Sequence, residues 1–133
     1  MFCFINCGPL VIDLPNIGVI IELEALVRHF ATTERKIVVV TGPILPKEKT
    51  VTIGANRVTV PTHHYKVIFD LTPPRKMIGF ILPNAGSDKP LAAFAVTVDA
   101  VEKATGLNFF SKVPKAEQDR LDRTISVKAW KGL

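Results

Sequence analysis

Cysteine is scarce in this sequence, and that scarcity excludes the disulfide frameworks that hold many small secreted domains together. Cys3 and Cys7 are the only two cysteines. In an extended segment their Cα atoms would lie roughly 13 Å apart, which is too far for a disulfide bond. No second pair of cysteines or histidines follows at zinc-finger spacing. We therefore expect two free thiols, which favours a reducing compartment.

Long apolar runs are also missing. No run reaches the roughly 18 residues that a membrane span needs, and the first ten residues carry no basic segment of a signal peptide. We therefore expect no contact with a membrane, and the sequence leaves the compartment unknown. Repeats, low-complexity tracts and linkers are absent as well, so residues 1–133 are predicted to form a single domain.

The residues that are present describe an ordinary soluble chain with an excess of basic side chains. Hydrophobic residues make up 47% of the sequence and charged residues 22%, as in typical globular domains. Lysine and arginine number 17 against 12 acidic residues, which gives a net charge of +5. This balance favours a polyanionic partner such as a nucleic acid.

The spacing of apolar residues predicts the fold class. Between residues 16 and 31 they recur every three or four positions, as on one face of a helix: Ile20, Leu23, Val27 and Phe30. Strands are predicted at residues 2–6, 36–41, 65–70, 76–82 and 91–98, with two short strands within 50–60. Short helices are predicted from Asp99 and over 115–123. This order predicts an α+β fold, with a long N-terminal helix, a largely antiparallel sheet and short C-terminal helices.

Local signals predict several boundaries. Gly42 and Pro43 should end the strand that precedes them. Asp99 should cap the first amides of its helix, with Glu102 three residues later completing a capping box. Gly106 should end that helix in the left-handed conformation.

Four stretches in a fixed order carry a resemblance to a known family: VVVTGPIL (38–45), RVTVPTHHYKVIFD (57–70), GFILPN (79–84) and VTVDAVEKATGLNFF (96–110). They resemble the DNA/RNA non-specific endonucleases, which include bacterial relatives of mitochondrial endonuclease G. The resemblance covers roughly residues 4–130. It implies part of a ββα-metal (His-Me finger) nuclease fold and metal-dependent hydrolysis of DNA and RNA phosphodiester bonds, leaving 5′-phosphate ends.

The resemblance also implies roles for four residues in the segment 6–28. Asn16 would be the one direct protein ligand of Mg²⁺, or of Mn²⁺ in its place, and a neutral amide oxygen suits such a hard cation. Glu24 would hold metal-bound waters. Arg28, one turn further on, would pair with Glu24 and stabilise charge on the phosphate. Asn6 would orient the site from its strand.

The same segment departs from the family pattern and allows simpler interpretations. Leu10 stands where glutamine is usual, Ile20 stands where tryptophan is usual, and one extra residue lies near Pro15. From spacing alone, an asparagine at a helix start is more often a cap than a ligand. A glutamate and an arginine four residues apart are an ordinary pair on a helix surface.

The general base of the family is the histidine of a D-R-G-H motif upstream of the metal-binding asparagine, and the fifteen residues before Asn16 contain no such motif. His63 matches a family histidine that is not the base. His64 stands where phenylalanine is common, and adjacent strand residues point to opposite faces. His29 lies outside the pattern and is expected to face solvent. We therefore expect the paired histidines to serve packing and hydrogen bonding.

Three hypotheses follow for a truncated nuclease domain without that motif. The chain is a metal-dependent non-specific endonuclease whose base comes from elsewhere. Alternatively, it is an inactive remnant that keeps some affinity for nucleic acid. In the third hypothesis it is a binding module whose open sheet edge pairs with a second copy, as a homodimer, or with a complementing N-terminal half.

Overall fold

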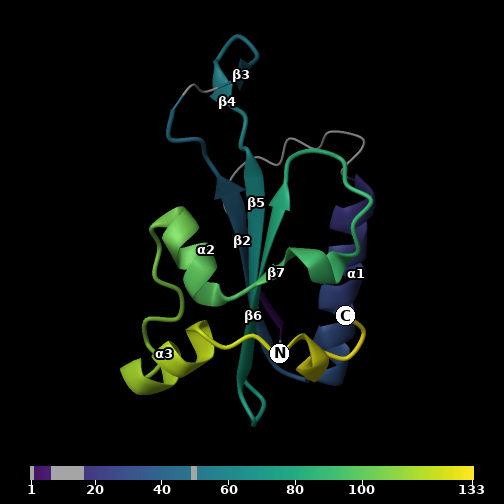
Figure 1. Ribbon diagram of the computed structural model, residues 1–133, viewed down its shortest axis with the longest axis vertical. Coiled ribbons are helices and arrows are strands. Elements are labelled where there is room, and N and C mark those ends of the chain that lie inside the picture. Colours follow the sequence, from purple (N-terminus) through teal and green to yellow (C-terminus); the bar gives the residue numbers. More distant parts are fainter. Residues whose placement is uncertain (1, 7–16, 49–50) are drawn as a thin grey trace.

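The computed structural model describes residues 2–6, 17–48 and 51–133. Figure 1 shows the arrangement of the helices and strands. The elements are β1 (Phe2–Asn6), α1 (Ile17–Thr33), β2 (Ile37–Ile44), β3 (Thr52–Ile53), β4 (Val58–Thr59), β5 (His63–Asp70), β6 (Lys76–Pro83), η2 (Leu91–Phe94), β7 (Ala95–Val96), α2 (Val98–Thr105), α3 (Lys115–Asp122) and η3 (Val127–Ala129).

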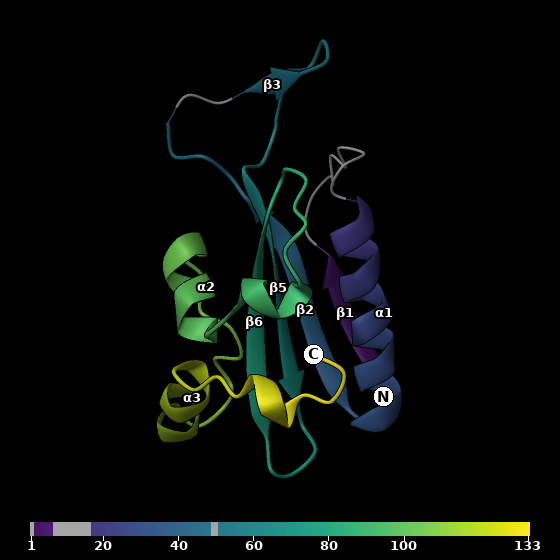
Figure 2. The same cartoon turned by 45° about the vertical axis from the view of Figure 1, so that its right-hand side comes forward.

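One five-stranded sheet organises the molecule, in the order β1-β2-β5-β6-β7. The pair β1 and β2 is parallel and is connected through α1, whereas every other neighbouring pair is antiparallel. Strands β3 and β4 form a separate hairpin that projects beyond the end of the sheet (Figures 1 and 2). The predicted α+β class and its largely antiparallel sheet are therefore confirmed.

Helix α1 covers one face of the sheet, and helices α2 and α3 cover the other (Figure 2). The predicted stripe of α1 is confirmed, because Leu23, Val27 and Phe30 are at most 2% exposed. These side chains pack against the alternate residues of the central strands that face α1, among them Val39 and Ile68. Two apolar layers thus hold the sheet, as its alternating strands predict.

The opposite layer forms around the residues of β5 that point the other way. Tyr65 and Phe69 pack there with Val101 of α2, Leu121 of α3 and the aromatic side chain of Phe109. The rings of Tyr65 and Phe109 lie 5.5 Å apart between centroids. Because both layers meet on β5, this strand is buried along almost its whole length.

The prediction that Gly42 and Pro43 end their strand is wrong, since β2 continues to Ile44. Gly42 lies opposite Tyr65, and a Cβ atom at this position would lie 2.7 Å from the tyrosine hydroxyl oxygen. The glycine therefore makes room for a ring and does not form a turn. Among the described residues, Thr41 is the last residue of β2 that pairs with β1, and Pro43 follows it. The missing N–H of Pro43 therefore removes no hydrogen bond between β2 and β1.

The strand predicted for residues 91–98 is also wrong in most of its length. Residues 91–94 form the 3₁₀ helix η2, and only Ala95 and Val96 pair with β6. The small and apolar residues of this segment pack against the core as part of a 3₁₀ helix. Apolar spacing over so short a run does not distinguish the two structures.

Helix α2 begins at Val98, and its cap is Thr97 and not Asp99. The Thr97 hydroxyl accepts a hydrogen bond from the Ala100 amide at 3.2 Å. Glu102 does not complete a capping box, because its Oε1 accepts a hydrogen bond from the Phe109 amide at 2.7 Å. The prediction for Gly106 is confirmed, since it ends the helix with a φ of 74°.

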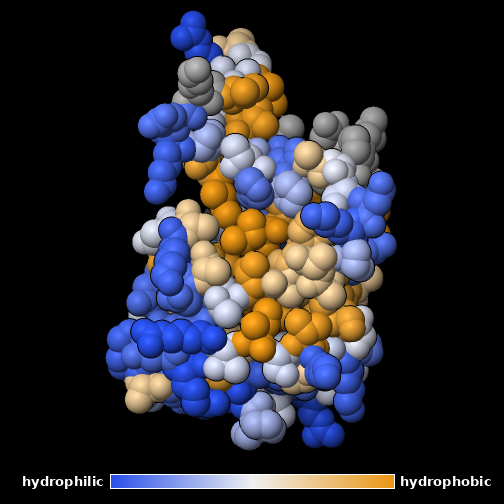
Figure 3. Space-filling model, viewed as in Figure 1, coloured by the Kyte–Doolittle hydropathy of each residue, from blue (hydrophilic) through white to orange (hydrophobic). Residues whose placement is uncertain are grey.

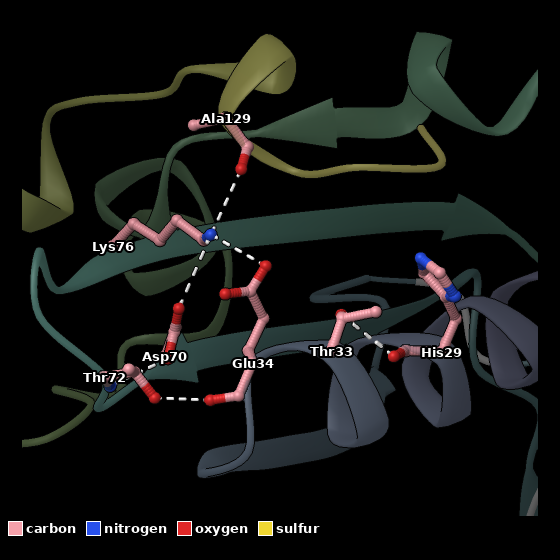
Figure 4. Close-up of polar contacts among 7 residues, drawn as sticks. All are labelled: His29, Thr33, Glu34, Asp70, Thr72, Lys76 and Ala129. Carbon is pink, nitrogen blue, oxygen red and sulfur yellow. Dashed lines mark hydrogen bonds and ion pairs between the residues drawn. The ribbon is translucent and has the colours of Figure 1, made fainter.

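The C-terminal tail returns to the face that α1 covers. Trp130 is 1% exposed, and its ring lies 4.8 Å from that of Phe30 between centroids. Lys76 holds the tail in place by donating to the Ala129 carbonyl oxygen at 3.1 Å (Figure 4). No helix among the described residues is long and apolar enough to cross a membrane.

Candidate functional site

An ion pair joins α1 to the centre of the sheet. The ammonium of Lys66 on β5 donates a hydrogen bond to Oε1 of Glu24 on α1. The Lys66 side chain is only 6% exposed, whereas that of Glu24 is 41% exposed. The lysine is therefore a buried support, and the carboxylate reaches solvent at the margin of the helix.

Lys66 lies on β5 because the strand alternates between the two layers. Ile68 and Lys66 share the face toward α1, while Tyr65 and Val67 face the other layer. A charge on the inner face is stable only if it is paired, and Glu24 supplies the partner one helix away. The pair therefore fixes the part of α1 that carries Glu24 over the middle of β5.

The strand register brings Asn6 into the neighbourhood of this pair. Asn6 at the end of β1 is the register partner of Thr41, and Thr41 is in turn the partner of Lys66. Thr41 donates a hydrogen bond from Oγ1 to the Tyr65 carbonyl oxygen at 3.0 Å. Two of the four predicted site residues, Asn6 and Glu24, thus belong to adjoining parts of α1 and the sheet.

The structure describes only one of the other two predicted site residues, Arg28 and Asn16. Arg28 is exposed on α1, and among the described residues Glu24 forms its ion pair with Lys66 and not with Arg28. The predicted Glu24–Arg28 pair is therefore not formed in this structure, where Lys66 binds Oε1 of the carboxylate. Asn16, the predicted metal ligand, lies outside the described residues.

The three histidines differ in burial. His29 is exposed, as predicted, and His63 is partly buried at the start of β5. His64 is 9% exposed, and its Nε2 has no hydrogen-bond partner. Burial lowers the pKa of His64, and the charge of His63 lowers it further. A buried neutral imidazole is suited to packing, but the predicted hydrogen bonding is not seen at Nε2.

Sequence reasoning missed Lys66, although one signal was available. It is the only lysine of β5 and is surrounded there by apolar and aromatic residues, where a charge needs a specific partner. Its partner could not be named, because Glu24 is 42 residues away in the chain. No group of three or more His, Cys, Asp and Glu side chains that could hold a metal ion occurs in the described part of the chain.

A second polar cluster lies at the far end of β5 and β6 (Figure 4). Lys76 contacts Glu34 at 3.0 Å and Asp70 at 3.5 Å between the ammonium and carboxylate atoms. Burial raises the pKa of Asp70, and the neighbouring Glu34 raises it further. Burial works in the same direction on Glu34, but the hydrogen bonds with Lys76 and Asp70 and the positive charge of Lys76 outweigh it and lower the pKa of Glu34. This cluster ties the end of α1 to the sheet and the tail.

Comparisons with known proteins give the family of the chain. A family model described as DNA/RNA non-specific endonuclease matches residues 1–116. The chain is 37% identical over 109 residues to mitochondrial endonuclease G of Caenorhabditis elegans, which covers 71% of this chain and 35% of that protein. It is 32% identical over 137 residues to mitochondrial nuclease 1 of Schizosaccharomyces pombe, covering 90% of this chain and 42% of that protein.

A solved structure shows the same fold. In the EndoG/EndoGI complex, a chain with 38% sequence identity matches this structure with a TM-score of 0.60, covering 70% of this chain and 43% of that chain. The chain thus spans less than half the length of these relatives. Its architecture is part of the ββα-metal nuclease fold, and the chain belongs to the DNA/RNA non-specific endonuclease family.

Proposed function

We propose that residues 1–133 form a nuclease domain, and that it contributes the metal-binding and phosphate-contacting part of an endonuclease. The reaction would be the hydrolysis of DNA and RNA phosphodiester bonds without sequence specificity. The observation that carries the proposal is the Glu24–Lys66 pair. It holds a partly exposed carboxylate on α1 beside the end of β1, where the family resemblance places its metal-site residues.

The available donor atoms suit a hydrated divalent cation. Only Oε1 of Glu24 is bound to Lys66, so Oε2 remains for a metal-bound water. A Mg²⁺ ion keeps several of its waters and requires few direct protein ligands, so it needs no cluster of three carboxylates or imidazoles. Asn16 would be its direct ligand, and Mn²⁺ could take the same place. When bound, the cation would offset the charge of the phosphate and of the leaving oxygen.

The remaining residues would position the substrate. Glu24 would orient water in the outer shell of the cation, and Asn6 would orient the site from β1. The exposed Arg28 would contact the phosphate, since it is not occupied by Glu24. The net charge of +5 would favour the approach of a nucleic acid strand.

The general base is proposed to come from a complementing N-terminal half. His64 is too buried to reach a water at the phosphate, and its Nε2 is enclosed. Within the described residues, β1 forms an edge of the sheet and pairs only with β2 (Figure 2). An open edge accepts a further strand, either from such a half or from a second copy in a homodimer.

Plasmid nicking with Mg²⁺ tests this function. The purified chain would be compared with an EDTA control and with Asn16→Ala, prepared identically. Cleavage that disappears in both controls would show a working metal site. Equal cleavage by Asn16→Ala would indicate contamination and would contradict the proposed site. Adding a separately expressed N-terminal half of a relative should raise the cleavage rate if the base is complemented.

The second candidate is a nucleic-acid-binding module without chemistry. The enclosed His64 favours it, because a buried imidazole is not placed to take a proton from a water at the phosphate. Under this function DNA binding would persist without cleavage, and its affinity would fall linearly with salt on a logarithmic scale. Sedimentation velocity over a range of protein concentrations would show whether the β1 edge forms a homodimer.

A further inference from the structure

The β3–β4 hairpin carries most of the exposed apolar residues of the described structure. Of the large hydrophobic side chains that are exposed there, two belong to other parts of the chain, Ile21 and Leu107. The rest lie in the hairpin or just before it: Leu45, Val51, Ile53 and Val58. Figure 3 shows apolar side chains gathered over the projecting hairpin. An ordinary protein surface scatters such residues singly, so this concentration on one element indicates an interaction surface.

The register of the hairpin places its apolar residues on one face. Ile53 is the partner of Val58, and the Val51 carbonyl oxygen accepts a hydrogen bond from the Val60 amide at 2.8 Å. Cross-strand partners share a face, and residues two apart in a strand do so as well. The hairpin therefore has an aliphatic face, which consists of Val51, Ile53, Val58 and Val60.

The opposite face of the hairpin carries hydroxyl groups, because Thr52 is the partner of Thr59 there. Such alternation is typical of a two-stranded ribbon with one side packed and the other in water. In this hairpin, however, the apolar side is open to solvent. Val51, Ile53 and Val58 are between 41% and 67% exposed. The sequence of the hairpin thus fits a packed ribbon, while the described residues leave its aliphatic face uncovered.

The hairpin is held by its own turn and not by packing on the sheet. It projects beyond the end of the five-stranded sheet (Figures 1 and 2). The Gly54 carbonyl oxygen accepts from the Arg57 amide at 3.1 Å, and this turn fixes the register that sorts the two faces. A two-stranded hairpin without further packing is only marginally stable in water. A partner on the aliphatic face would therefore stabilise it.

We propose that the aliphatic face binds the same face of a second copy of this chain. Two hairpins would stack across a two-fold axis, as packed sheets do at roughly 10 Å. The β-branched side chains of one copy would pack against those of the other, while Thr52 and Thr59 remain in water. A two-fold dimer uses the same surface patch on both copies, so that patch must match itself, and an uncharged aliphatic ribbon does.

The charges of the chain favour a second copy over a nucleic acid on this face. A nucleic acid is held mainly by cations at its phosphates, and the aliphatic face contains no cation. Two copies of net charge +5 repel each other, but exposed charges more than about 10 Å apart are largely screened at 0.1 M salt. Because the hairpin projects, two aliphatic faces can meet while the two sheets stay separated (Figure 2).

The size of the hairpin sets the affinity that we expect. A standard protein interface takes roughly 20–30 residues from each partner. The hairpin and the segment before it offer fewer, because they comprise residues 45–48 and 51–60 of the described chain. The interface is therefore small, and the dimer should be reversible with a Kd of roughly 1–100 µM.

This dimer is independent of the proposed nuclease reaction, since it requires neither a metal ion nor cleavage. It assigns the second copy to the hairpin and leaves the edge of β1 open for a complementing N-terminal half. Failure of the proposed function would leave the dimer standing. A monomeric chain would overturn the dimer and leave the proposed function untouched.

Sedimentation velocity of the full chain tests the dimer. The protein would be measured at concentrations from below to well above the expected Kd, at low and at high concentrations of NaCl. We expect a concentration-dependent dimer that salt does not weaken, because salt screens the repulsion between basic copies and leaves apolar packing intact. A wild type that stays monomeric throughout, or a dimer that dissociates in salt, would overturn the proposal.

Two neighbouring residues provide a matched pair of variants for the same measurement. Ile53→Glu places a carboxylate on the aliphatic face, and Thr52→Glu places it on the opposite face of the same strand. Ile53→Glu should weaken the dimer roughly tenfold or more, because the charge is buried without a partner. Thr52→Glu should change its Kd by less than about threefold, since the carboxylate stays in water.

A second pair on β4 guards against a local folding defect. Val58→Glu should repeat the effect of Ile53→Glu, and Thr59→Glu should repeat that of Thr52→Glu. Far-UV circular dichroism would compare the four variants with the wild type. Equal losses within both pairs would overturn the proposal. So would a dimer that survives both Ile53→Glu and Val58→Glu, as one formed through the β1 edge would.

Binding of a short single-stranded oligonucleotide, measured by fluorescence anisotropy, tests the other occupant of the face. Ile53→Glu and Thr52→Glu lower the net charge equally, so they should lower this affinity equally if the aliphatic face does not bind nucleic acid. Equal effects here, with unequal effects on the dimer, support the proposal. Loss of oligonucleotide binding in Ile53→Glu alone would assign the face to nucleic acid and overturn it.

Discussion

Glu24 on α1 accepts a hydrogen bond from the ammonium of Lys66 on β5, and the two residues differ sharply in their exposure to solvent. Lys66 lies almost wholly within the molecule, while Glu24 has access to water. Removing one partner should therefore cost a different amount of stability from removing the other. Loss of the carboxylate leaves a charge inside the protein, whereas loss of the lysine leaves a charge that water can solvate.

We predict that Glu24→Gln destabilises the protein more than Lys66→Met does. Glu24→Gln should lower the free energy of unfolding by about 1–3 kcal/mol, because Lys66 then keeps its buried charge without this carboxylate. Lys66→Met should change it by about 1 kcal/mol or less, since methionine fills a similar volume. Urea unfolding at pH 7 measures both. A larger loss for Lys66→Met would contradict the asymmetry.

The sequence predicted the elements around this pair but not the pair itself. Periodicity places Leu23, Val27 and Phe30 on the inner face of α1, because each turn of the helix repeats the same requirement for burial. It also fixes the faces of β5, since alternation sets which side chain points inward. The contact between Glu24 and Lys66 depends on how α1 crosses the sheet, and no local pattern encodes that crossing.

The family motifs predicted other features of the protein than the local patterns did. They identified the family through stretches such as VVVTGPIL, while the roles of Asn6, Asn16, Glu24 and Arg28 stay predictions. The pattern predicts that the glycine of that stretch ends a strand, but Gly42 lies within β2 and makes room for the Tyr65 ring on β5. A glycine that ends a strand and one that admits a neighbouring ring look the same in the sequence.

Arg28→Gln tests whether the exposed arginine of α1 serves the proposed nuclease. It should lower plasmid nicking roughly 10- to 100-fold, because a charge-assisted bond to phosphate is lost in the transition state. Stability should change by less than about 0.5 kcal/mol, since Arg28 is a surface residue. Arg123→Gln is the charge-matched control, at the exposed residue that follows α3. Equal activity of the two variants would exclude a specific role for Arg28.

The cap of α2 provides a test of the local structure. Thr97→Ala should lower the free energy of unfolding by about 1 kcal/mol, because the Ala100 amide loses its side-chain acceptor. Asp99→Ala should cost about 0.5 kcal/mol or less, since Asp99 makes only an exposed pair with Lys103. Thermal or urea unfolding at pH 7 compares them. A larger effect of Asp99→Ala would restore the capping box that the sequence predicts.

Asp122 should make the stability of the chain depend on pH. It ends α3, it is 5% exposed, and one of its oxygens has no hydrogen-bond partner. Burial, together with the charges of Glu102 and Asp119, raises the pKa of Asp122 to about 6. The negative charge also opposes the carbonyl end of the helix. The folded protein therefore favours the protonated form.

The sign of the pH effect follows from these pKa values. Between the unfolded value of 3.8 and the folded value of about 6, the folded state binds more protons than the unfolded state. Its stability therefore falls as the pH rises through this range and levels off above it. Asp122→Asn removes the charge with little change in shape, so it should stabilise the protein by about 1–3 kcal/mol above pH 6. The gain should vanish below about pH 4.

Urea unfolding of the wild type and Asp122→Asn at several pH values between 4 and 7.5 measures this difference. Asp119→Asn is the matched control on the exposed side of α3, and its effect should have the opposite sign. The hydrogen bond from Lys115 lowers the pKa of Asp119, so the folded state favours its charged form. If Asp122→Asn changed stability by the same amount at every pH, the shift would not lie at this carboxyl group.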